Sequence, residues 1–323
     1  FLLLPGLAQM DVDVHEAGAD DGPRHGDDFG SGVCPNLRGR VLPESGDAAA
    51  RDQFNAGCAP LYVPPADLQA AIASLNTHAV QGRPRERDHA LATRQVALPT
   101  VPEPAWAEPG TVGSPMAALD AQFVRLVQAN PQLRPRVGNP DELRSNKLDA
   151  TLDLLKHRVQ VPETGVAESR TGAVITALNE EAVVCAALAN KGGLNLVVTY
   201  EAFAPKMLGA LRQELIFSRH LREAGRPPGW LGVPVVLTSH TWENAKNEQS
   251  HQDPTLAEAL LGEMADGARV CFPPDGNSAM VALTHSLQAQ GTITALVVPK
   301  REVPNLLTSA QAHRLADEGL LLL

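Results

Sequence analysis

From Gly172 to Val298 the sequence alternates short apolar runs with longer segments of helical periodicity. The apolar runs are 173–178, 194–199, 233–237, 268–272 and 293–298. The helical segments between them are 180–191, 204–221, 255–264 and 277–288. Short, fully apolar strands that alternate with helices are typical of a parallel sheet whose two faces are both covered. We therefore predict an α/β fold, a parallel sheet with helices on both faces, extending from about Asp141 to Val303.

Two helices are expected before this alternation. Ser114 and Pro115 form a helix start, because the hydroxyl can cap the helix and proline fits its first position. An apolar stripe at helical spacing follows, at positions 116, 119, 123, 126 and 127, and Pro131 ends it. A second helix is predicted over 140–157, with Leu148, Leu152 and Leu155 on its inner face.

The first third of the chain has a different character. Residues 1–98 show little hydrophobic periodicity and a helical signal only near 66–75, so they are predicted to be an abbreviated, irregular region. The proline-rich stretch 99–112 is predicted to be a linker, 113–304 the α/β domain and 305–323 a C-terminal tail. His15, His25, Asp27, Asp28 and Cys34 match no standard zinc spacing. An acidic surface loop is expected there, and no metal ligands are assigned.

Charge and cysteine usage narrow the class of protein. The 323 residues carry a formal net charge of −10, which argues against a nucleic-acid-binding surface. No apolar run approaches the roughly 20 residues that a membrane helix needs. The four cysteines include no CxxC pair, and Cys185 and Cys271 fall in apolar periodic segments as expected buried thiols. A reduced, cytoplasmic protein is predicted.

A long polar loop, Ser239–Pro254, directly follows the apolar run 233–237. It holds two histidines, two glutamates, an aspartate, a lysine, four amides and a tryptophan. Ligands of open α/β sheets bind beyond the carboxyl ends of the strands, so this loop is a candidate site. The alternative, a solvated excursion, stays open.

The other predicted strands also end in polar residues. Glu180 follows the first, Tyr200 and Glu201 the second, Asp275 the fourth and Lys300 the fifth. Glu180 could instead complement a helix dipole, Asp275 could cap a helix, and Lys300 could be a surface charge. Their convergence on one edge favours a pocket for a polar, anionic ligand.

Six short motifs carry a more specific signal. They are PDELRSNKL (140–148), TYEAF (199–203), TSHTW (238–242), SHQDP (250–254), FPPDGN (272–277) and VPK (298–300). In this order and spacing they resemble the thiamine diphosphate-dependent phosphoketolases. That family cleaves xylulose 5-phosphate or fructose 6-phosphate with inorganic phosphate to give acetyl phosphate. The resemblance covers about 113–304, the family's pyrimidine-binding domain.

The resemblance implies a carbon–carbon lyase of the phosphoketolase type, with thiamine diphosphate and Mg²⁺ as cofactors and a homodimer as its assembly. Glu180 resembles the glutamate that hydrogen-bonds the aminopyrimidine. Glu142 resembles a second active-site carboxylate at the cofactor, and Tyr200 a residue that packs near the pyrimidine.

For the sugar phosphate and inorganic phosphate, the resemblance implies four more residues. Ser145, His251 and Lys300 resemble groups that bind substrate phosphate or shuttle protons, and Asn247 matches a substrate-contacting amide. A hydroxyl, an imidazole and an ammonium together suit a phosphate dianion. Glu180, His251 and Glu142 are the predicted catalytic residues.

A second hypothesis rests on departures from the family pattern. Asn244, Ala245 and Lys246 stand where the family carries glutamine, aspartate and histidine. Only about 100 residues stand in place of the family's diphosphate-binding domain. The alternative is therefore a degenerate, non-catalytic relative or fragment that acts as a binding or regulatory subunit.

Overall fold

The computed structural model describes residues 63–81, 93–140, 142–241, 243, 252–263 and 266–320. The chain forms two compact units, Phe1–Thr93 and Arg94–Leu323. In the first unit, helix α2 (Pro65–Val80) confirms the helical signal near 66–75, and its side chains are exposed. The five residues considered for an N-terminal metal cluster lie outside the described residues.

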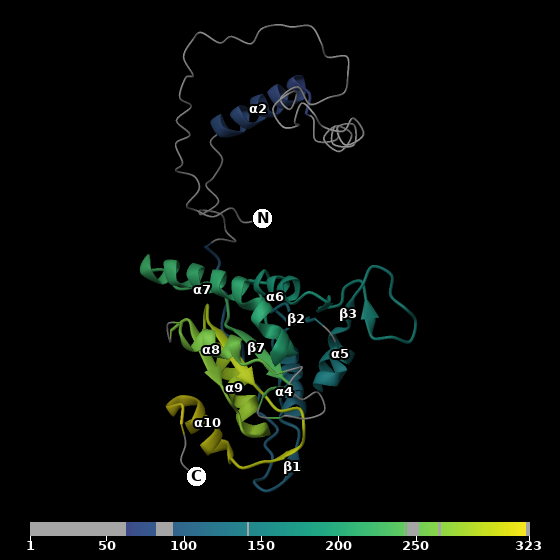
Figure 1. Ribbon diagram of the computed structural model, residues 1–323, viewed down its shortest axis with the longest axis vertical. Coiled ribbons are helices and arrows are strands. Elements are labelled where there is room, and N and C mark those ends of the chain that lie inside the picture. The colour runs from purple at the N-terminus through teal and green to yellow at the C-terminus, as the bar shows by residue number, and fades with distance from the viewer. Residues whose placement is uncertain are drawn as a thin grey trace, which may run out of the picture. The chain divides into compact units, whose positions relative to one another are not determined.

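A parallel sheet forms the centre of the second unit (Figure 1). Its strands are β2 (Arg136–Asn139), β3 (His157–Arg158), β4 (Glu168–Ser169), β5 (Val174–Thr176), β6 (Asn195–Tyr200), β7 (Val233–Thr238), β8 (Ala268–Cys271) and β9 (Ile293–Val297). Within the described residues these eight strands pair in the order β4-β3-β5-β2-β6-β7-β9-β8, all parallel. A separate antiparallel pair joins β1 (Val112–Gly113) to β10 (Val303–Pro304).

Helices cover both faces of this sheet. The helices of the second unit are α4 (Pro115–Ala129), α5 (Asp149–Leu155), α6 (Glu180–Leu188), α7 (Leu208–Glu223), α8 (Thr255–Leu261), α9 (Gly276–Gln288) and α10 (Ser309–Glu318), with short 3₁₀ segments η4 (Arg144–Asn146) and η5 (Glu201–Met207). Helix α10 packs against α9 and not on the sheet. Leu196 and Val198 of β6 pack in one core with α4, α5 and α9. Val197, between them, packs in a second core with α6, α7 and α8. Because strand side chains alternate in direction, the two cores lie on opposite faces, and the predicted fold class is confirmed.

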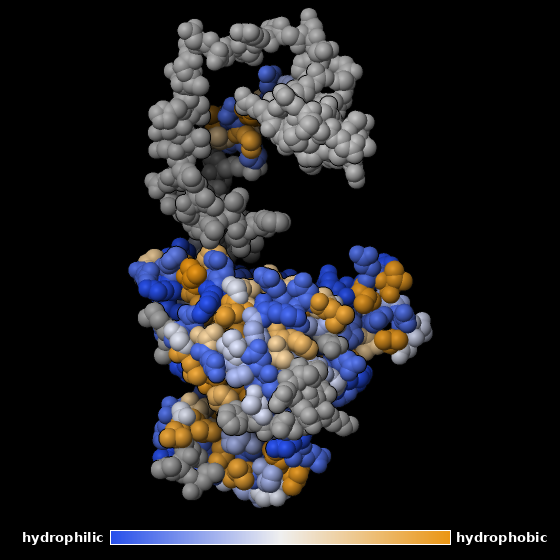
Figure 2. Space-filling model, viewed as in Figure 1, coloured by the Kyte–Doolittle hydropathy of each residue, from blue (hydrophilic) through white to orange (hydrophobic). Residues whose placement is uncertain are grey.

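Helix caps form where the sequence indicated them. The Ser114 hydroxyl accepts a hydrogen bond from the Ala117 N–H at the start of α4. Four of the five predicted stripe residues of α4 are fully buried: Met116, Leu119, Phe123 and Leu126. The surface of the unit in the view of Figure 2 is mainly hydrophilic, with hydrophobic residues interspersed.

Two expectations need correction, and an inner strand of the sheet was not predicted. The predicted helix over 140–157 is only α5, because Lys147 adopts a left-handed φ of 61° that no helix continues. Strand β2 was not predicted, since Val137 is its sole large apolar residue. Cys185 is exposed and Cys271 half-buried, so the prediction of two buried thiols is wrong. On α6 the buried face is formed by Val183, Val184, Ala187 and Leu188, which leaves Cys185 on the outer side.

The predicted division at 98, 112 and 304 stays a prediction. Within the second unit, 305–320 contains helix α10, whose start is capped by Thr308 and Gln311. No helix among the described residues is long and apolar enough to span a membrane.

Candidate functional site

The carboxyl edge of the sheet gathers the loops that the sequence singled out. Strands β5, β2, β6, β7 and β9 are consecutive neighbours, although they are far apart along the chain. Because all of them are parallel, the segments that follow them emerge at the same edge. Tyr200 is the last residue of β6, and the segments after β5, β2, β7 and β9 carry Glu180, Ser145, His240 and Lys300, respectively.

Tyr200 is the centre of a compact side-chain cluster. Its hydroxyl lies 2.6 Å from the Ser145 Oγ. The Lys300 Nζ lies 4.6 Å from the centroid of the Tyr200 ring, within the range of a cation–π contact. All three side chains are partly exposed. The structure therefore brings together a hydroxyl pair and an ammonium that the sequence had assigned to substrate or cofactor.

The segment that replaces the predicted helix explains the position of Ser145. Its Oγ donates to the Glu142 carbonyl, and the buried Asn146 side chain donates to the same carbonyl. The Asn146 Oδ1 in turn accepts a hydrogen bond from Thr238 at the end of β7. The loop after β2 is thus fixed to a neighbouring strand, and the Glu142 side chain is left exposed.

Lys300 lies in a field of mixed charges. Burial lowers the pKa of its ammonium, the carboxylates of Glu243 and Glu142 raise that pKa, and Lys147 lowers it. Glu243 is 4% exposed, and its Oε1 accepts the backbone N–H groups of Lys300 and Arg301 at 3.0 and 2.8 Å. Glu243 therefore fixes the backbone of Lys300 and also attracts its charge.

Glu180 joins the cluster through a row of contacts. It is the first residue of α6, after the capping Asn179, and it is 9% exposed. Its Oε2 lies 3.3 Å from the Lys206 Nζ, which lies 5.2 Å from the Phe203 ring centroid. The Phe203 and Tyr200 rings are 6.2 Å apart. Glu180 and Lys300 are thus the two ends of one continuous row along the carboxyl edge.

Glu201 holds the polar loop that follows β7. Its Oε2 accepts the Thr241 N–H and hydroxyl, each at 2.8 Å, and the Asp253 N–H at 3.1 Å. Thr241 and Asp253 flank the part of the loop that includes Asn247 and His251. Those two predicted site residues lie outside the described residues, so their roles stay predictions.

His240 was not predicted as a functional residue. Its ring is 6% exposed, and neither ring nitrogen has a hydrogen-bond partner among the described residues. Burial lowers the pKa of the imidazole, although the Glu243 and Glu201 carboxylates oppose that shift. The preceding residue, Ser239, has a left-handed φ of 49°, which is uncommon outside glycine and asparagine.

Sequence reasoning missed the supporting roles of Glu201, Glu243 and His240. The available signal was their position, because Glu201 and His240 follow strands directly and lie within the TYEAF and TSHTW motifs. The hydrogen-bond partners of Glu201 and Glu243 are distant in the chain, and the burial of His240 also depends on the fold, so only the fold identifies these roles.

The motif after β8 has a structural role. The Asp275 carboxylate is fully buried and accepts the N–H and hydroxyl of Ser278. It also accepts the N–H groups of Leu306 and Leu307. The alternative reading of Asp275 as a cap is therefore the one that its contacts support.

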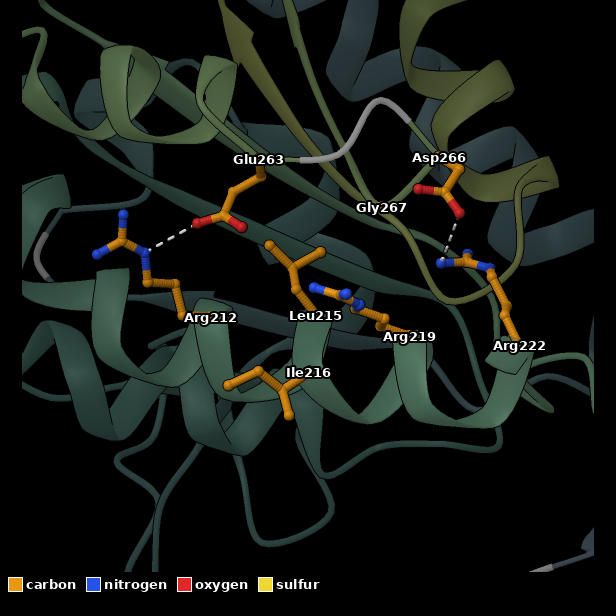
Figure 3. A pocket seen from close by; sticks show the side chains of 8 residues that line it. All are labelled: Arg212, Leu215, Ile216, Arg219, Arg222, Glu263, Asp266 and Gly267. Carbon is orange, nitrogen blue, oxygen red and sulfur yellow. Dashed lines mark hydrogen bonds and ion pairs between the residues drawn. The ribbon is translucent and has the colours of Figure 1, made fainter. Parts of the chain in front are cut away.

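Two hollows of the second unit lie elsewhere. One, about 210 Å³, lies between α7 and the residues Glu263, Asp266 and Gly267 (Figure 3). There Arg212 pairs with Glu263, and Arg222 lies near Asp266, so most of its charge is balanced. The other lies at the amino edge of the sheet. Across the described residues, no group of three or more histidine, cysteine, aspartate or glutamate side chains could hold a metal ion.

The chain is similar in sequence to known proteins. A family model described as D-xylulose 5-phosphate/D-fructose 6-phosphate phosphoketolase matches residues 117–289, just over half of the chain. The chain is 28% identical over 254 residues to a probable phosphoketolase of Brucella abortus (strain 2308), covering 76% of this chain and 31% of that protein. It is 30% identical over 224 residues to one of Bradyrhizobium diazoefficiens, covering 66% of this chain and 27% of that protein.

The chain thus spans less than a third of the length of these two relatives. Among solved structures, it is similar to a transketolase from Leishmania mexicana. The TM-score is 0.52 at 18% identity, covering 82% of this chain and 36% of that one. At this identity the likeness concerns the fold alone.

Proposed function

This chain belongs to the phosphoketolase family, and we propose that its second unit supplies the pyrimidine side of a thiamine diphosphate site. The proposed reaction is cleavage of a ketose phosphate by inorganic phosphate to give acetyl phosphate. The observation that supports it best is the contact row from Glu180 to Lys300, because it joins every predicted site residue within the described residues except Glu142 by direct side-chain contacts. Glu142 lies beside the row, since it bonds Ser145 through its carbonyl.

The residues at the Glu180 end fit an aminopyrimidine. A largely buried carboxyl group offers a hydrogen-bond partner, and the neighbouring Tyr200 and Phe203 rings offer apolar faces. When bound, thiamine diphosphate supplies the carbanion chemistry that carbon–carbon cleavage requires. Glu180 would hold and orient the ring, and Lys206 would set the charge beside that carboxyl group.

The residues at the Lys300 end fit phosphate. An ammonium and a hydroxyl are common phosphate ligands, and the contact with Tyr200 orients the Lys300 side chain. Burial lowers the pKa of Lys300, which eases release of a proton from its ammonium during turnover. Glu142, His251 and Asn247 complete the proposed site, with His251 moving protons. Mg²⁺, a homodimer and a cytoplasmic location belong to the same proposal through the family resemblance.

A second candidate is a non-catalytic binding or regulatory subunit. It is favoured by Asn244, Ala245 and Lys246, which replace the glutamine, aspartate and histidine expected of the family. Such a chain would keep the Glu180 row and bind the cofactor without forming acetyl phosphate.

Calorimetry with thiamine diphosphate and Mg²⁺ tests the first step. Saturable binding is expected, and Glu180→Ala should weaken it at least about 10-fold, as loss of a charge-assisted hydrogen bond predicts. Glu181→Ala is the matched control, because Glu181 starts the same helix but is exposed. No binding at millimolar cofactor would contradict the proposal. Trapping acetyl phosphate as a hydroxamate from fructose 6-phosphate and phosphate then separates the two candidates, since binding without product supports the second.

A further inference from the structure

The hollow at the amino edge of the sheet carries an unusual charge. It measures about 430 Å³ and opens where β2 and β5 begin. Four cations line it, together with the hydroxyls of Ser169 and Thr171; the cations are Arg134, Arg136, Lys156 and Arg158. No acidic residue of the described part of the chain lines it. In a chain of net charge −10, such a concentration of positive charge requires an explanation.

These cations have no carboxylate partners among the described residues, unlike Arg144, Arg212 and Arg314. Arg134 donates from Nε to the Asn190 amide oxygen at 2.7 Å. The Nε of Arg136 is buried and makes no hydrogen bond within the same residues. Burial lowers the pKa of Arg136, and the charges of Arg134 and Arg158 lower it further. The cluster is therefore self-repelling, and an anion would relieve that repulsion.

Lys156 supports a functional origin for this charge. Its backbone has φ 57° and ψ 150°, a conformation that glycine adopts far more easily than lysine. The Lys156 carbonyl accepts the Val174 N–H, and a Cβ on Gly172 would lie 2.6 Å from that carbonyl oxygen. Close packing thus fixes the backbone, and a lysine occupies a position where glycine would be unstrained.

We propose that this pocket binds a small anion carrying two phosphate groups. Guanidinium groups match phosphate oxygens with paired hydrogen bonds, and four cations balance the charge of a diphosphate. The volume lies within the range of about 300–1,000 Å³ that small-molecule sites occupy. The pocket is separate from the candidate active site, because Arg136 begins β2 whereas the loop with Ser145 follows its end. The proposal does not rest on the proposed function.

Calorimetric titration of the full chain with inorganic pyrophosphate is the test. Saturable binding of one molecule per chain at the pocket is expected. Arg136→Gln and Arg158→Gln should each weaken it at least about 10-fold, because each removes a charge-assisted contact. Arg226→Gln is the matched control, since it removes one exposed positive charge outside the pocket and should change the affinity less than about twofold. Inorganic phosphate should bind more weakly than pyrophosphate.

Two further variants keep the test independent of folding and of the active site. Lys156→Gly should weaken pyrophosphate binding while the thermal midpoint is unchanged or raised, because glycine fits the backbone there. Lys300→Met should leave pyrophosphate binding unchanged, since Lys300 lies at the opposite edge of the sheet. Absence of binding, equal losses in Arg136→Gln and Arg226→Gln, or loss in Lys300→Met alone would each overturn the proposal. Phosphate binding as tightly as pyrophosphate would overturn its two-phosphate form.

Discussion

The ends of β6 and β8 both carry a polar motif of the phosphoketolase family, but the two motifs use their polar groups differently. After β8, the Asp275 carboxylate bonds Ser278 and two backbone N–H groups of 306–307. Asn277 bonds the backbone of Ala107 and Leu307. After β6, Tyr200 contacts the side chains of Ser145 and Lys300, all partly exposed.

The difference separates a structural brace from a candidate site. A buried acceptor whose lone pairs meet backbone donors has no capacity left for a ligand. Partly exposed side chains that meet one another can exchange those contacts for a ligand. Polar residues at a strand end therefore do not identify a candidate site by themselves. The groups to which those residues hydrogen-bond distinguish a structural brace from a candidate site.

Asp275→Asn should have the largest effect on stability. The amide would turn an N–H donor toward backbone donors, and the expected loss is about 3–5 kcal/mol of the free energy of unfolding. Urea denaturation measures it. Asp266→Asn is the control, because that carboxylate is exposed and its ion pair with Arg222 is long, at 3.8 Å. Its effect should stay within about 0.5 kcal/mol. Equal losses of unfolding free energy in the two variants would contradict the structural role of Asp275.

Glu201→Gln should destabilise by about 2–3 kcal/mol, because one carboxylate oxygen accepts three hydrogen bonds from Thr241 and Asp253. The substitution should also increase hydrogen exchange at the Thr241 and Asp253 amides, because Glu201 is a structural brace close to the candidate site. Glu258→Gln, on the exposed side of α8, is the control. A loss of stability without faster exchange at Thr241 would argue against local anchoring.

His240 should make stability fall in acid. Burial lowers the pKa of the folded-state imidazole below its ordinary value of 6.5, so below that pH the unfolded state binds more protons. Stability contributed by the neutral ring is complete above pH 6.5 and declines as pH falls toward the folded-state pKa. His240→Gln should reduce this decline in the free energy of unfolding measured between pH 7 and pH 5. An unchanged pH dependence would mean that the ring is protonated equally in both states.

Tyr200→Phe should have the smallest effect on stability, about 0.5–1 kcal/mol, because it removes one partly exposed hydrogen bond to Ser145. Its larger consequence should appear in binding of the cofactor or of phosphate, measured by calorimetry. A loss comparable with that of Asp275→Asn would show that the Tyr200 cluster is itself structural.

Much of the fold could be predicted because its strands are wholly buried. All residues of β7 and β9 are buried, which produces the apolar runs that the sequence displays. Strand β2 escaped prediction because Gly138 packs there against Val183, where a Cβ would meet the Val183 carbonyl oxygen at 2.7 Å. Glycine leaves no apolar signal. Helix α10 was not predicted, although Thr308 and Gln311 have the spacing of a capping box.

The sequence indicated some of the residues that the structure brings together at the candidate site, and their roles stay predictions. Strand ends indicated Glu180, Tyr200 and Lys300, and the family motifs added Glu142 and Ser145. The hydrogen bonds of Glu201 to Asp253 and of Glu243 to Lys300 span more than 50 residues, and no local pattern encodes them. A continuous helix over 140–157 would have placed Ser145 incorrectly, because the chain turns at Lys147, whose φ is left-handed.

The strand order also bears on how the protein is made. Strand β8 pairs only with β9 within the described sheet, and β9 inserts between β7 and β8. During synthesis β8 therefore emerges with no partner and waits until residues 293–297 have left the ribosome. Unpaired strand edges promote aggregation in such intermediates. A nascent chain that has emerged only as far as 272–292 therefore has a sheet whose edge is open at β7, and β8 is unpaired at that stage.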